Sequence, residues 1–134
     1  MIDREHAQMM LTLARSDLTV LDVSRDMPRI TTAVFGFHAQ QAVEKALKAW
    51  LTIAGGSYPK IHDLEELFEL LREHRQAIPE RFLRLEYLTD FATQFRYVLS
   101  EDLVVDIDRL ALFRDVAEVI DHVARLILHN KPAP

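Results

Sequence analysis

Cysteine is absent from the chain of 134 residues, and glycine and proline are scarce, with three and five residues. Without thiols the chain can form neither disulfides nor cysteine-ligated metal sites, and we expect a cytoplasmic setting, which is reducing. The few prolines fall between segments of helical periodicity, a distribution typical of long helices with short connections. No segment alternates polar and apolar residues, so we expect no sheet.

The sequence also lacks a cationic excess and a long apolar run. Its formal net charge of -5 argues against sequence-independent binding of nucleic acid, because phosphates are held by clustered cations, although a local basic site stays open. No apolar run reaches membrane-spanning length and the first ten residues do not resemble a signal peptide, so we expect no membrane association. The hydrophobic fraction of 49% is enough for one domain with a substantial core.

Apolar periodicity predicts an all-α domain of five helices over residues 1–130, followed by a disordered tail at 131–134. The expected helices cover residues 3–27, 31–56, a short stretch from 63, the stretch from 79 to about 99, and the stretch from about 106 to 129. The helix at 31–56 is apolar over more than half of its circumference, so we expect it at the centre of a bundle, with Trp50 in the core.

A narrow polar stripe remains on this central helix, formed by Gln41, Glu44, Lys45 and Lys48. Because Glu44 and Lys48 have the favoured i,i+4 order, a solvated face with helix-stabilising charge pairs explains part of the stripe. The alternative is a ligand-binding site, since a polar stripe on a largely buried helix is where function is expected. Both interpretations stay open at this point.

Two further groups of residues are candidates for chemistry. His62 and Asp63 precede the third helix, where Asp63 can act as a cap, and a histidine there could bind an anion beside the helix N-terminus. Glu118, His122 and His129 share one helix face and could be interpreted as metal ligands. A charge-mixed, solvated face is the favoured interpretation of those three, so we expect neither a metal nor a cofactor.

The first helix carries a second apolar stripe, nearly opposite its core-facing one, formed by Met9, Leu13, Val20 and Met27 around Ser16. This face either meets a partner or tolerates water. Scattered surface hydrophobes explain it about as well as a partner does, because much of any protein surface is apolar.

Three motifs stand out in the chain: FHAQQAVEKALKA at residues 37–49, YPKIHDL at residues 58–64, and Arg96 followed by Tyr97. Together they resemble the HEPN domain family, helical modules described in higher eukaryotes and prokaryotes as nucleotide-binding. Residues 37–49, FHAQQAVEKALKA, are similar to the signature helix of the family. Residues 58–64, YPKIHDL, are similar to its P-K-T-H-D-L connector, with Ile61 in the place of Thr. Arg96 and Tyr97 stand where members often carry R-Y-P at the end of the fourth helix, with Val98 in the place of Pro.

The resemblance, to the stand-alone prokaryotic type, implies an up-and-down bundle with a groove between the second and fourth helices. It also implies a homodimer, for which the second stripe of the first helix is the leading candidate contact. Many members act with a minimal nucleotidyltransferase, in toxin–antitoxin-like pairs. Some are ribonuclease toxins that use an Arg-x4-6-His motif, but no arginine of this chain has a histidine at that spacing.

We therefore predict a non-catalytic HEPN protein, either a module that binds a nucleotide, RNA or another phosphate, or an accessory of a nucleotidyltransferase. The alternatives are a ribonuclease toxin with a degenerate motif and a purely structural dimerisation domain. The predicted ligand-binding residues are Gln41, Glu44, Lys45, Lys48, His62, Asp63, Arg96 and Tyr97. In this hypothesis Lys45, Lys48 and Arg96 supply the cations that hold the phosphate.

Overall fold

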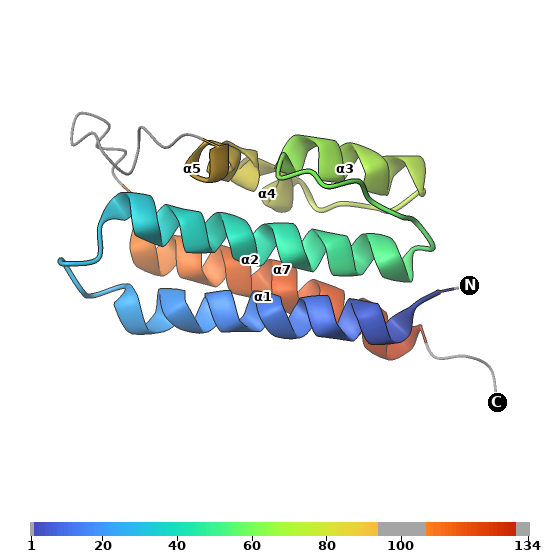
Figure 1. The fold of residues 1–134 in the computed structure, drawn as a ribbon, viewed down its shortest axis with the longest axis horizontal. Helices are drawn as coiled ribbons and strands as arrows, with labels where there is room; N and C mark the ends of the chain where they lie inside the picture. The colour runs from blue at the N-terminus through green and yellow to red at the C-terminus, as the bar shows by residue number, and fades with distance from the viewer. Residues whose placement is uncertain (1, 94–106, 131–134) are drawn as a thin grey trace.

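A computed structural model describes residues 2–93 and 107–130 of the chain. The elements are the helices α1 (Arg4–Ser24), α2 (Thr32–Ile53), α3 (Leu64–Glu73), α4 (Glu80–Leu83), the 3-10 helix η1 (Arg84–Leu88), α5 (Thr89–Thr93) and α7 (Arg109–His129). No strand occurs in these two ranges, and the predicted all-α, up-and-down bundle is confirmed (Figure 1). Arg96, Tyr97 and the tail at 131–134 lie outside the described residues.

Helix α2 is the centre of the bundle, as its wide apolar arc predicts. It contacts α1, α7, α3 and α5, and in Figure 1 it lies between α1 and the layer formed by α3, α4 and α5. Trp50 is 1% exposed, which confirms its predicted place in the core. Fully buried alanines such as Ala42 and Ala46 leave room for the neighbouring helices. Within the described ranges, no helix is both long and apolar enough to cross a membrane.

Local signals in the sequence set most helix ends. The N-terminal caps, each of which accepts a backbone N–H with its side chain, are Asp3, Thr31, Asp63 and Asp108. Helix α2 ends in the left-handed turn that the two glycines predict. Gly55 has φ +86°, and the Gly56 N–H donates to the carbonyl oxygen of Leu51 at 2.8 Å.

The predicted fourth helix is wrong as a single element, because the structure divides its described part into α4, η1 and α5. The buried side chains of this stretch are Phe82, Leu85, Leu88 and Phe91. They recur every three residues, which matches the three residues per turn of a 3-10 helix better than 3.6. Tightening the helix places all four side chains on the face that packs against the core.

Helix α7 matches its predicted range, with one correction on its face. His122, which we predicted on the solvated outer face, is half-buried between two core rings. Its ring centroid lies 4.9 Å from that of Trp50 and 5.3 Å from that of Phe82. Arg81 and Glu118, by contrast, form an exposed ion pair at 2.6 Å that links α4 to α7.

Candidate functional site

The polar stripe of α2 faces neighbouring elements of the bundle, and Glu44 is the centre of the larger of its two networks. The Glu44 side chain is only 5% exposed. Its Oε1 accepts from Gln40 Nε2 at 3.0 Å and lies 3.0 Å from His62 Nδ1, while its Oε2 accepts from Lys48 Nζ at 3.0 Å. The Glu44–Lys48 pair predicted from the i,i+4 spacing is therefore present, but it is buried rather than solvated.

The connector between α2 and α3 (residues 54–63) runs back along α2 and covers this network. Gln40 Nε2 donates to the backbone oxygen of His62 at 2.9 Å, and Gln41 Nε2 donates to Gln40 Oε1 at 2.7 Å. Further back, Lys48 Nζ lies 5.2 Å from the centroid of the Tyr58 ring. Burial, with a smaller contribution from the Glu44 carboxylate, raises the pKa of Tyr58, so this residue stays a neutral phenol near pH 7.

The second network joins α2 to α1 and takes up the other lysine of the stripe. Lys45 Nζ donates to Asp17 Oδ2 at 2.6 Å, and His38 Nδ1 lies 3.0 Å from Asp17 Oδ1. Lys45 and Lys48 thus engage different carboxylates on different sides of α2. A phosphate that approached either lysine would have to compete with an ion pair already made.

His62 is the member of the Glu44 network that reaches solvent. Its side chain is 62% exposed, and no described residue makes a hydrogen bond with its Nε2. Beside His62, the first backbone N–H groups of α3 are already used in hydrogen bonds. Asp63 caps the Glu65 N–H at 2.9 Å, and the Leu64 N–H donates to Thr89 Oγ1 at 3.0 Å. Solvent can therefore reach the network through the imidazole, and the first backbone amides of α3 are occupied.

The structure brings together Gln41, Glu44, Lys48 and His62 of the predicted site residues, with Asp63 beside them as a helix cap. It separates Lys45 from them, and Arg96 and Tyr97 lie outside the described residues. Three network members, Asp17, His38 and Gln40, were not among the predicted site residues. The signal that would have identified Asp17 and Gln40 is a polar side chain at a core-facing position of an apolar helix, since both are buried.

Within residues 2–93 and 107–130, no three His, Cys, Asp or Glu side chains gather in a way that could hold a metal ion. We predicted that Glu118 and His122 lie on a solvated face with mixed charges. This is correct for Glu118, which is paired with Arg81, but not for His122, which packs against aromatic rings.

Comparison with known families places the architecture and the motifs in one context. The family model described as HEPN domain matches residues 7–130, which run from the first turn of α1 to the residue after α7. No curated protein and no solved structure matches the chain.

Proposed function

The chain belongs to the HEPN domain family, and from this we propose that it is a non-catalytic module that binds a phosphate-bearing ligand beside the α2–α3 connector. The ligand class is a nucleotide or a short RNA. As in partnered members of the family, the module acts together with a nucleotidyltransferase, and a neighbouring reading frame for such an enzyme would support this part of the proposal. Arg96 remains a predicted contributor to phosphate binding.

The proposal rests on one contact, in which the buried carboxylate of Glu44 orients the exposed imidazole of His62. Glu44 holds His62 at Nδ1, so the ring is kept in one orientation and Nε2 points away from the network. When it is protonated, an imidazole held in this way donates from Nε2 to a phosphate oxygen at little entropic cost, while Nδ1–H stays on Glu44. Lys48 Nζ, 3.0 Å from Glu44 Oε2, offsets the negative charge of the carboxylate that holds the imidazole.

We propose a non-catalytic function because the chain has no Arg-x4-6-His motif. A ribonuclease that works without metal needs a proton-transferring group beside the scissile phosphate, and histidine is the usual one. The Glu44–His62 pair also favours a second candidate, because a carboxylate-oriented imidazole can act as a general base. In this candidate function His62 replaces the histidine of the ribonuclease motif.

The binding proposal is tested by adding AMP and a short RNA to the ¹⁵N-labelled protein. We expect saturable chemical-shift changes in α2 and in residues 58–64, which weaken as salt is added. His62→Ala should reduce the affinity, whereas His129→Ala, which removes another exposed histidine at the end of α7, should leave it unchanged. The absence of saturable shifts at millimolar ligand would contradict the proposal.

A cleavage assay separates the two candidate functions. Labelled RNA should stay intact after prolonged incubation with the wild-type protein. If the RNA is cut, and His62→Ala abolishes cutting while His129→Ala does not, the ribonuclease candidate replaces the binding module.

A further inference from the structure

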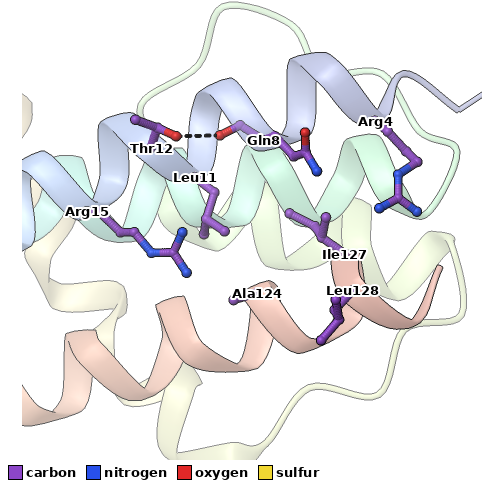
Figure 2. A pocket seen from close by; sticks show the side chains of 8 residues that line it. All are labelled: Arg4, Gln8, Leu11, Thr12, Arg15, Ala124, Ile127 and Leu128. Atoms are coloured by element: carbon purple, nitrogen blue, oxygen red, sulfur yellow. Dashed lines mark hydrogen bonds between the residues drawn. The ribbon is translucent and has the colours of Figure 1, made fainter. Parts of the chain in front are cut away.

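A groove of about 370 Å³ runs between α1 and α7 (Figure 2). The residues that line it are Arg4, Gln8, Leu11, Thr12, Arg15, Ala124, Ile127 and Leu128. None of them belongs to the Glu44 network or to the α2–α3 connector. The groove is therefore a surface with a separate role from the proposed phosphate site.

The floor of the groove is aliphatic. Leu11 and Ile127 are each 4% exposed, and Ala124 lies between the two helices beside them. Leu128 stands at one wall with 57% of its surface exposed, which is unusual for a leucine beside a concave surface. Burying these side chains under a partner would remove apolar area from water.

Two arginines extend from α1 at opposite ends of the groove, as Figure 2 shows. Arg4 is fixed at one end by a hydrogen bond from its guanidinium to the carbonyl oxygen of Asn130. At the other end, Arg15 has no ion pair with any described residue, and no acidic side chain lines the groove. On a chain with a formal net charge of -5, this local positive character calls for a negatively charged occupant.

We propose that this groove is the docking site for an acidic amphipathic helix of a partner protein. Arg4 and Arg15 are eleven positions apart on α1, which is about 16 Å along the axis at 1.5 Å per residue. A helix lying along the groove carries acidic side chains at the same separation when they are three turns apart. Its aliphatic residues between these two ends meet Leu11, Ala124 and Leu128, as in other helix-in-groove complexes.

The lining residues disfavour a nucleic acid as the occupant. Single-stranded bases gain affinity by stacking on aromatic rings, and none of the eight lining residues is aromatic. A free phosphate or nucleotide would reach only one of the two arginines, because of their separation. The helix is the ligand that uses both arginines and the aliphatic floor together.

The probe for this site is a helical peptide with leucines along one face and glutamates at both ends of that face. A matched peptide carries lysine in place of each glutamate. We expect the acidic peptide to bind, with chemical-shift changes at Gln8, Thr12, Ala124 and Leu128, and the basic peptide to leave these signals unchanged. Shifts would be expected here and not at residues 58–64, so this test is independent of the phosphate site.

Two pairs of variants locate the binding. Arg15→Glu should weaken the acidic peptide by about tenfold or more and permit binding of the basic one. Arg114→Glu makes the same charge change on the exposed surface of α7 outside the groove, and should leave the affinity unchanged. Leu128→Ser should weaken binding, whereas Leu110→Ser, at another exposed leucine of α7, should not.

Several outcomes would overturn the proposal. Equal binding of both peptides, or equal losses in Arg15→Glu and Arg114→Glu, would show that binding is not made at this groove. A single-stranded oligonucleotide that displaces the acidic peptide would identify a nucleic-acid surface instead. If the same groove signals shift with rising protein concentration alone, a second copy of the chain occupies it.

Discussion

At the scale of single residues, His122 shows how the packing around a side chain changes its chemistry. Its half-buried imidazole lies against the Trp50 and Phe82 rings. Burial lowers the pKa of His122, and the nearby Arg125 and Arg81 lower it further. The lowered pKa favours the neutral imidazole near pH 7, where the ring packs as part of the aromatic cluster.

The lowered pKa predicts a pH dependence of stability with a defined sign. The unfolded chain takes up a proton at this position as the pH falls below about 6.5, before the folded protein does. The stability that neutral His122 contributes is therefore present above that pH and is lost as the pH falls towards the lowered folded-state pKa. His122→Phe keeps the ring packing without the titration, so it should lose less stability than the wild type between about pH 7.5 and pH 5.

Urea unfolding of both proteins at the two pH values gives this difference. His129→Phe serves as the control, because it replaces an exposed histidine of the same helix that does not pack against the Trp50 and Phe82 rings. If wild type and His122→Phe lose the same stability on acidification, His122 does not carry the effect.

At the scale of elements, Gly36 sets how closely α5 packs against α2. A Cβ atom placed on this glycine would lie 2.5 to 2.7 Å from ring atoms of Phe91, well inside van der Waals contact. Phe91 is 7% exposed and belongs to the core. The missing side chain therefore makes room for an aromatic ring at the contact between the two helices.

Gly36→Ala is a test of this contact in which two effects have opposite signs. In an exposed helix interior the change stabilises by about 1 kcal/mol. Here the clash with Phe91 should reverse the sign, so we expect a net loss of roughly 1–3 kcal/mol in the free energy of unfolding. The same change in a Phe91→Leu background should be less harmful, because the ring is gone. A stabilised Gly36→Ala protein would show that α5 can move away freely.

At the scale of the whole molecule, the second stripe of α1 leaves apolar side chains exposed in the part of the chain that the structure describes. Met9 is 50% exposed and Leu13 42%, whereas the opposite face of the helix is buried. Met27 is 50% exposed but lies beyond the end of α1 at Ser24, so the stripe is shorter than predicted. Val23, with 61% exposure, extends the same stripe towards the end of α1. We expect this face to form the contact of a homodimer, in which a two-fold axis brings the same stripe together from both subunits.

Leu13→Glu tests the dimer in sedimentation experiments. A buried carboxylate at the contact is costly, so the variant should be monomeric at concentrations where the wild type is dimeric. Leu110→Glu places the same charge on an exposed leucine of α7 and should remain a dimer. A dimeric Leu13→Glu protein would move the contact elsewhere, with α7 as the next candidate, and a monomeric wild type would make the dimer prediction wrong.

Much of the fold follows from the sequence, because the signals that specify it are local. The apolar arc of residues 31–56 identifies the central helix, and its width places Trp50 in the core. Aspartates and a threonine at the starts of helices, and Gly55 at the end of α2, set the boundaries within a few residues. Family membership likewise rests on motifs that can be identified in the chain itself.

Only the tertiary structure decided how the polar side chains of α2 are used. The sequence places Lys45 and Lys48 on one stripe, but Asp17, 28 positions away, takes the first and Glu44 takes the second. Which carboxylate a lysine meets depends on the rotation and separation of packed helices, and these do not appear in the periodicity of a single segment. For the same reason half of the predicted site is assembled at Glu44, while Lys45 belongs to the α1 contact.

The conformation of the chain between helices was also decided by packing. Arg75 adopts φ +58° after α3, and the Gln76 N–H donates to the Leu71 carbonyl oxygen at 3.0 Å, as in a glycine-capped helix end. No glycine marks this position in the sequence. The turn between α1 and α2 is likewise completed by a distant residue. The Arg109 guanidinium donates there to the backbone oxygens of Ser24, Met27 and Ile30. Local sequence determined where the helices form, and contacts between residues distant in the chain determined how their ends and polar faces are satisfied, because each such contact needs both partners in place.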